Sequence, residues 1–131
     1  MTRKELKKLV WYIQRIPIHF KKLYWKKCFQ VKPAEASRME HSKWSKGKLG
    51  KRFYGCADNY RQKVYLDIGL CFYQKQQPLS MICRVLIHEV CHLAFNTHYV
   101  SKYEKAAVKH LVAWDEAEQR ILKLLIRKNL K

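Results

Sequence analysis

The chain has 131 residues, of which 48 % are apolar, and its 28 lysine and arginine side chains outnumber 10 acidic ones to give a net charge of +18. This composition excludes a disordered chain, and the length allows one domain with a modest core. We expect an intracellular protein, because no apolar run reaches the roughly 18 residues of a transmembrane segment and no signal-peptide pattern follows the start. The charge favours polyanionic partners, with nucleic acid ahead of an anionic membrane.

The first 29 residues are predicted to form a basic, aromatic helical segment that Pro17 interrupts. Apolar residues recur at helical spacing over residues 2–14, which predicts a helix there. Residues 18–29 continue as a second amphipathic segment in which lysines lie beside aromatic side chains. That pattern is typical of a helix that packs on a sheet, and it also occurs on surfaces that bind single-stranded nucleic acid or a membrane.

Residues 30–69 are predicted to form a small antiparallel β-sheet. Residues 52–56 and 62–68 are strand candidates joined by a turn around Asp58 and Asn59, so we expect a hairpin. Polar and apolar residues alternate over 62–68, as in a strand with one buried face.

Two helices are predicted in the second half of the chain. Pro78 precedes a helix that is apolar nearly all round, continues to about Phe95 and ends at Asn96. The capping-box pattern from Ser101 to Glu104 predicts the start of a C-terminal helix over 101–130. We therefore predict a single α+β domain, in which a small antiparallel sheet packs on a buried helix with flanking N- and C-terminal helices.

The buried helix carries the pattern H-E-x-x-H at His88, Glu89 and His92. Residues four apart share a helix face, so both imidazoles can reach one metal ion, and Zn2+ binds neutral imidazole readily. Glu89 is then placed to act as general base toward a zinc-activated water. Buried histidine and glutamate are costly on an apolar helix unless they have partners or a metal, which favours the metal site.

The third zinc ligand stays open between two positions. His98 lies six residues after His92, just past the predicted helix end, and a turn at Asn96 and Thr97 can bring it back to the metal. The competing ligand is a carboxylate of the last helix, Glu118 or Glu116. Nearby groups that can steady an oxyanion or support the ligands are Tyr99, Tyr103 and His110.

The eleven residues from His88 to His98 resemble the H-E-x-x-H-x-x-x-x-x-H segment of the SprT-like zinc metallopeptidases and of the YgjP-type (WLM) metal-dependent hydrolases. The resemblance implies a minimal zincin-like domain in which His88, His92 and His98 bind zinc and Glu89 activates water. SprT-like proteins are associated with DNA and cleave proteins attached to it. Minimal gluzincins are the second similar group, and they imply a helix glutamate such as Glu118 as third ligand.

We therefore predict a zinc-dependent metallopeptidase that acts on proteins associated with nucleic acid, with residues 79–98 as active-site helix and third-ligand turn. Residues 64–68 are the candidate strand for aligning an extended peptide substrate. The alternative is a basic nucleic-acid-binding protein with a structural or inactive zinc site, and a third hypothesis is a membrane-surface protein that uses residues 1–29. Five cysteines without a C-x-x-C pair are predicted to be buried, reduced thiols.

Overall fold

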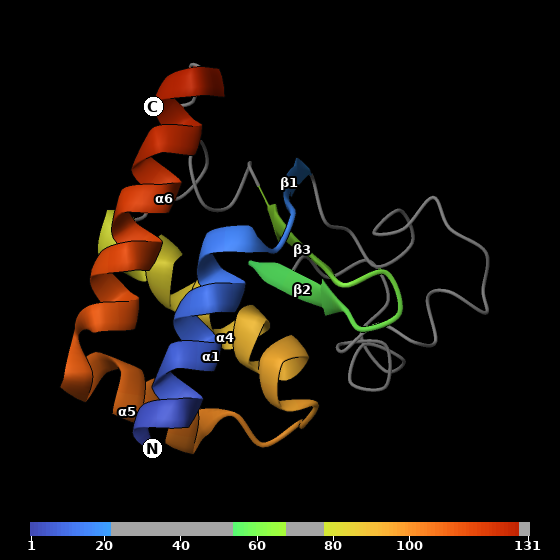
Figure 1. The fold of residues 1–131 in the computed structure, drawn as a ribbon. Helices are drawn as coiled ribbons and strands as arrows, with labels where there is room; N and C mark the ends of the chain where they lie inside the picture. The colour runs from blue at the N-terminus through green and yellow to red at the C-terminus, as the bar shows by residue number, and fades with distance from the viewer. Residues whose placement is uncertain (22–53, 68–77, 129–131) are drawn as a thin grey trace.

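The computed structural model describes residues 1–21, 54–67 and 78–128, which form a small α+β fold (Figure 1). The helices and strands in chain order are α1 (Arg3–Arg15), β1 (Ile18–Lys21), β2 (Gly55–Asp58), β3 (Lys63–Asp67), α4 (Leu79–Phe95), α5 (Ser101–His110) and α6 (Val112–Lys128). None of these described helices combines the length and the apolar character that crossing a membrane requires.

Helix α1 begins and ends where the sequence predicts, within one residue. The Thr2 hydroxyl accepts from the backbone N–H of Glu5, and the Glu5 carboxylate accepts from the N–H of Thr2, which completes a capping box. Leu9 and Ile13 are fully buried on the inner face of the helix. At its other end, the Arg120 guanidinium of α6 donates to the carbonyls of Ile13 and Ile16, which have no partner within the helix. Burial of Arg120, aided by the charge of Arg127, lowers its pKa to about 10.

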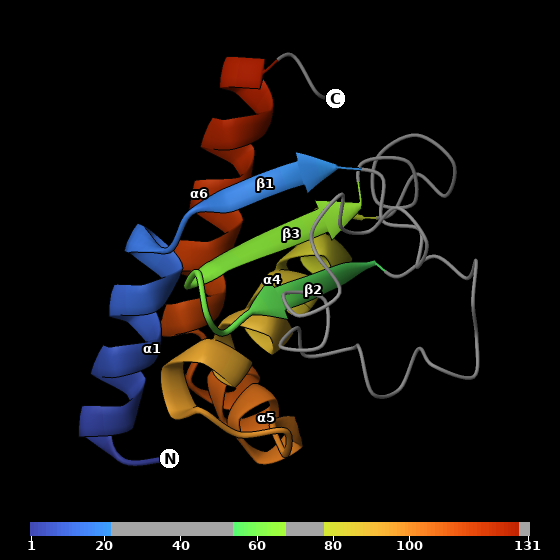
Figure 2. The same cartoon turned by 90° about the vertical axis from the view of Figure 1, so that its right-hand side faces the viewer.

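The sheet has three strands in the order β1-β3-β2, and it is mixed rather than antiparallel (Figure 2). β2 and β3 form the predicted antiparallel hairpin, with Gly55 opposite Leu66. The first strand covers Gly55–Asp58 rather than 52–56, so Asp58 belongs to the strand and not to the turn. Residues 64–67 are all buried, so the prediction of one buried face for 62–68 is wrong over these residues. β1 pairs parallel with β3, with Ile18 opposite Val64. The prediction of a helix over 18–29 is therefore wrong for Ile18–Lys21. Pro17 ends the helix, and the next four residues pair with the edge of β3. The remainder of that segment and residues 30–53 lie outside the described residues.

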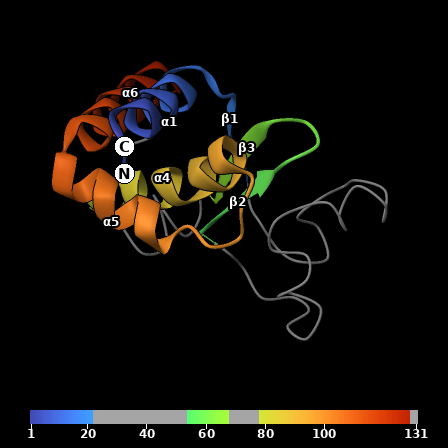
Figure 3. The same ribbon diagram turned by 60° about the horizontal axis from the view of Figure 1, so that its bottom comes forward.

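Helix α4 is the central element, and its predicted position is confirmed. Figure 3 shows α4 with the sheet on one side and α1, α5 and α6 on the other, and these elements contact it directly. Its fully buried apolar side chains meet those of α1, α6 and β3 in one core. The helix ends at Asn96, which has a φ of 47° and a ψ of 50° in the left-handed conformation that asparagine tolerates.

The predicted single helix over 101–130 is instead two helices. Leu111 has a φ of 66°, which ends α5, and α6 begins at Val112 in a new direction. The predicted capping box at the start of α5 is also wrong, since the N-cap is Val100 and no side chain caps this end. The Glu104 carboxylate contacts Nδ1 of His88 instead. Residues 129–131 lie outside the described residues.

Candidate metal centre

His88 and His92 lie one turn apart on α4, and their side chains face each other. The two Nε2 atoms are 3.1 Å apart, and the ring centroids are 4.7 Å apart with the planes at 78°. His92 is buried, whereas His88 is partly exposed at the end of the pair nearer to solvent. The H-E-x-x-H spacing therefore brings the two predicted ligand nitrogens to one point.

The other ring nitrogen of each histidine points at an acceptor. Nδ1 of His92 lies 2.8 Å from the backbone carbonyl oxygen of Thr97, just after α4. Nδ1 of His88 contacts the carboxylate of Glu104, which α5 supplies. A carbonyl and an ionised carboxylate only accept hydrogen bonds, so both Nδ1 atoms carry the proton. In the neutral imidazole each Nε2 then presents a lone pair.

Two Nε2 atoms 3.1 Å apart are compatible with a hydrogen bond through a second proton on one ring, or with a metal ion bound by both. Two nitrogens bound to one tetrahedral Zn2+ at about 2.0–2.1 Å are roughly 3.3 Å apart, which is close to the observed separation. Histidine ligands of zinc typically donate their second N–H to a carboxylate or a backbone carbonyl, and these two do so. These two nitrogens and their outer partners would supply two of the ligands that a zinc site needs.

Glu89 occupies the interior side of the pair. Its side chain is 2 % exposed, and its Oε1 lies 4.0 Å from Nε2 of His88. A carboxylate beside the two Nε2 atoms is within reach of a water molecule held at the same point. Its role as general base stays a prediction.

Glu104 contacts His88, and sequence reasoning missed this contact. Its three-residue spacing from Ser101 matches a capping box, yet its carboxylate orients His88. The only sequence signal for this role is an acidic residue in the first turn of the helix that follows the motif, and that signal does not separate a cap from a histidine partner.

His98 lies near the histidine pair but does not contact the two Nε2 atoms in this arrangement. Its ring centroid is 6.4 Å from that of His92, and the side chain is exposed in the turn between α4 and α5. Within residues 1–21, 54–67 and 78–128, no group of three or more His, Cys, Asp or Glu side chains is arranged to hold a metal ion. The third-ligand role of His98 stays a prediction, which needs a shift of this exposed turn.

The competing carboxylates contact other parts of the molecule. Glu116 accepts from the side-chain amide of Gln14 on α1 at 2.8 Å. Glu118 lies close enough to Cys83 to raise the pKa of that thiol. Cys83 precedes His88 by five residues, which is about 7.5 Å along the helix axis. The Glu116 carboxylate is therefore directed at α1, and the Glu118 carboxylate lies near the first half of α4.

The remaining candidate groups lie around the turn and α5. Tyr103 stacks on Phe95 with ring centroids 4.0 Å apart, which ties α5 to the end of α4. Tyr99 is highly exposed, and its backbone N–H donates to the Thr97 hydroxyl. His110 is exposed at the last residue of α5. Tyr103 is thus a packing residue in this arrangement, and the oxyanion role of all three stays a prediction.

The described cysteines are buried free thiols, as the sequence predicts for Cys56, Cys83 and Cys91. Burial, together with the Glu104 and Glu89 carboxylates, raises the pKa of Cys91 far above its usual range. Burial and the Glu118 carboxylate raise the pKa of Cys83 to about 12. These two thiols stay protonated at neutral pH, a state that binds metals poorly. Cys28 and Cys71 lie outside the described residues.

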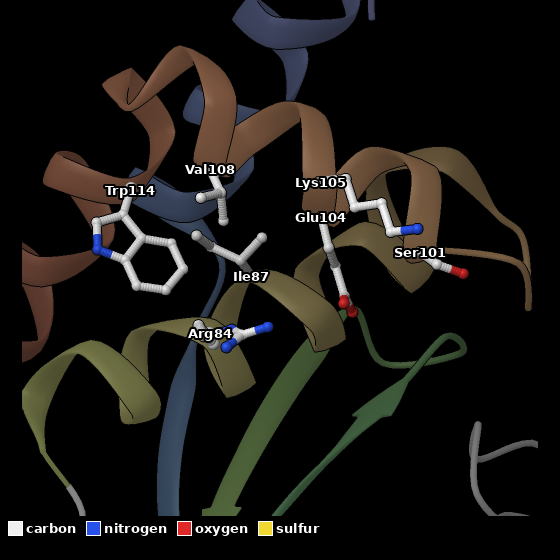
Figure 4. Close-up of a pocket in the computed structure, with 7 residues that line it drawn as sticks. All are labelled: Arg84, Ile87, Ser101, Glu104, Lys105, Val108 and Trp114. Atoms are coloured by element: carbon white, nitrogen blue, oxygen red, sulfur yellow. The ribbon is translucent and has the colours of Figure 1, made fainter.

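A pocket of about 280 Å³ lies among α4, α5 and α6 (Figure 4). Glu104 links it to His88, since one side chain both lines the pocket and contacts that imidazole. Arg84 and Lys105 contribute cationic groups at its rim, and Ile87 and Trp114 contribute apolar surface. A change in the pocket that moves Glu104 will therefore change the contact between its carboxylate and the His88 imidazole.

The strand predicted to align a substrate is the wrong one. β3, which contains most of residues 64–68, is paired on both edges, with β1 on one side and β2 on the other. An extended peptide cannot add to a strand whose edges are both occupied. Within the described sheet β1 and β2 are the edge strands, and β2 contacts α4.

Comparison with protein-family models, with curated proteins and with solved structures gives no match for this chain. The resemblance to the SprT-like and YgjP-type families therefore stays a prediction carried by residues 88–98. The histidine pair and its partners are the features of this chain that point to a function.

Proposed function

We propose that the protein is a zinc-dependent metallopeptidase. The observation that carries the proposal is the pair of imidazole Nε2 atoms 3.1 Å apart, each on a ring whose Nδ1 is directed at an acceptor. Burying polar groups on an apolar helix costs free energy, and a cation bound by the two imidazoles would offset that cost.

In the proposed site His88 and His92 would hold the metal, and His98 would be the third protein ligand. Bound zinc lowers the pKa of a water molecule and polarises a carbonyl group. Glu89 takes a proton from the attacking water and delivers it to the leaving amine, for which its buried carboxylate beside His88 is suited. Glu104 and the carbonyl of Thr97 keep the imidazoles in the tautomer that exposes Nε2.

The substrate class that we propose is protein or peptide associated with nucleic acid. The net charge of +18 attracts such complexes by long-range electrostatics. An extended segment of the substrate would add to β2, an edge strand of the described sheet that contacts α4. The competing proposal is a nucleic-acid-binding protein whose zinc site is structural, and it is supported by the same charge.

The variant Glu89→Gln tests the proposal, with Glu118→Gln as a matched control on α6. Zinc content is measured by mass spectrometry on untagged protein, and turnover is measured on an unfolded protein substrate with and without DNA. We expect about one zinc per chain in all three proteins. Turnover should fall about 10²–10⁴-fold in Glu89→Gln only, as for the loss of a general base.

Two outcomes contradict the proposal. Folded wild type that contains no zinc and takes up none from solution removes the metal site. Zinc in every protein with no turnover in any favours the structural zinc site of the competing proposal.

A further inference from the structure

Three large apolar side chains are exposed where α1 meets the junction of α5 and α6. Trp11 is 51 % exposed, Leu111 is 55 % exposed and Val112 is 50 % exposed. Trp11 and Val112 line the same open groove of about 550 Å³, and Leu111 is the neighbour of Val112 in the chain. We call these three residues the apolar corner. Figure 1 shows α1 beside α6, with the junction of α5 and α6 near the start of α1.

Cationic side chains of α1 line the groove beside the apolar corner in a regular order. Arg3, Lys7, Trp11 and Arg15 follow each other at four-residue intervals, so they share one face of α1, and all four line the groove. The Arg15 guanidinium lies over the Trp11 ring, 5.1 Å from its centroid. The surface therefore combines exposed apolar groups with a rim of positive charge.

The backbone at Leu111 is strained, and burial does not repay that strain. A φ of 66° crowds the side chain of an L-residue, and glycine or asparagine adopts it at lower cost. Packing in the core does not offset this cost, since Leu111 is 55 % exposed. Strain of this kind is concentrated at functional positions.

We propose that the apolar corner docks on an anionic membrane surface. Leu111, Val112 and Trp11 would enter the boundary between head groups and acyl chains, and Arg3, Lys7 and Arg15 would contact the anionic head groups. This division is the one that interfacial helices use, with Trp and Leu on the inserted face and Lys or Arg around it.

Single-stranded nucleic acid fits the corner less well. Bases stack on open aromatic faces, whereas Arg15 covers one face of Trp11 and the other two members of the corner are aliphatic. Aliphatic side chains are stabilised by burial among acyl chains, whereas they cannot stack on a nucleic-acid base as an aromatic ring does. The proposal is independent of the peptidase activity.

Co-sedimentation with vesicles tests the proposal on the full chain. Vesicles of phosphatidylcholine with roughly 30 % phosphatidylserine are compared with pure phosphatidylcholine. We expect wild type to bind the anionic vesicles more tightly. The partition coefficient should fall about fivefold in Leu111→Asn and about twentyfold or more when Trp11→Gln is added, although neither variant changes the charge.

Matched controls separate the corner from general effects. Ile126→Gln removes another exposed apolar side chain roughly 21 Å further along α6 and should bind as wild type does. Arg3→Gln with Lys7→Gln should weaken binding about tenfold, whereas Arg84→Gln with Lys105→Gln removes the same charges at the other pocket and should cost about twofold at most.

Each contrary result overturns the proposal. It fails if wild type ignores anionic vesicles, or if the Trp11 and Leu111 variants bind them unchanged. It also fails if those variants keep vesicle binding and lose binding to a labelled oligothymidylate, because the corner is then a nucleic-acid surface. Circular dichroism of every variant confirms that it is folded, and asparagine suits the backbone at position 111.

Discussion

The histidine pair on α4 and the apolar corner on α1 and α6 depart from the usual distribution of side chains in opposite directions. At the pair, polar and ionisable groups are buried, with Glu89 at 2 % exposure inside the core helix. At the corner, Trp11, Leu111 and Val112 are half exposed beside charged groups. Buried polar groups and exposed apolar patches are the informative exceptions in a folded protein.

The difference lies in what each region still needs. The pair is satisfied on its outer side by Glu104 and the Thr97 carbonyl and converges inward on one point, which suits a small cation. The corner has charges at its rim and apolar groups at its centre, which suits a broad amphipathic surface. One chain thus presents a site for an ion and a separate surface for a much larger partner.

The largest effect is expected at the third ligand of the pair. Zinc binding in small sites is worth about 10–16 kcal/mol in total, so one of three protein ligands accounts for roughly 3 kcal/mol or more. His98→Ala should therefore weaken zinc binding by about 100-fold or more, as measured by competition with a chelating dye. Glu118→Ala should change it less than about twofold, since that carboxylate is near Cys83. The reverse order of effects would move the third ligand to α6.

A smaller effect is expected at the outer side of the pair. Glu104→Ala removes the partner of Nδ1 of His88, and such changes typically cost about 10–100-fold in metal affinity. Glu104→Gln should recover part of the loss, because its amide oxygen still accepts the N–H. Glu116→Ala serves as control, since its carboxylate binds Gln14 instead. Equal zinc affinity in Glu104→Ala and wild type would show that Glu104 does not position His88.

The contact between α1 and α6, which supports the apolar corner, is the next to be tested. Arg120→Gln leaves the carbonyls of Ile13 and Ile16 without their charged donor, so we expect a loss of about 2 kcal/mol in the free energy of unfolding. Lys123→Gln is the control, because that side chain is exposed on the same helix and should cost less than about 0.5 kcal/mol. Urea unfolding measures both, and similar losses would contradict this account of α1.

The smallest effect is a gain in stability at the corner. Leu111→Asn relieves the strain of a leucine at φ 66° and should raise the free energy of unfolding by about 1 kcal/mol. The control Leu122→Asn places the same substitution at an exposed helical position of α6, where it should lower stability by about 0.5 kcal/mol. A loss at both positions would mean that Leu111 is held by packing, which would remove the argument from strain.

Local pattern predicted α1 and α4 well, because α1 has a strong helical periodicity, α4 is a long apolar run, and both have clear end signals. Thr2 and Pro17 bound α1, and Pro78 and Asn96 bound α4. The prediction failed at Ile18–Lys21, where four residues after a proline joined an existing strand instead of starting a helix. It also failed at Leu111, since no local signal marks a leucine for a left-handed conformation.

For the candidate site, the amino-acid sequence by itself determined that His88, Glu89 and His92 share one helix, because the four-residue period is a property of the helix. Only the tertiary structure decided that α5 brings Glu104 to His88, that β3 is closed on both edges, and that Trp11 meets Val112. These relations depend on the break at Leu111 and on pairing between distant segments. Contacts of that kind arise from how separate elements pack, which spacing along one helix does not encode.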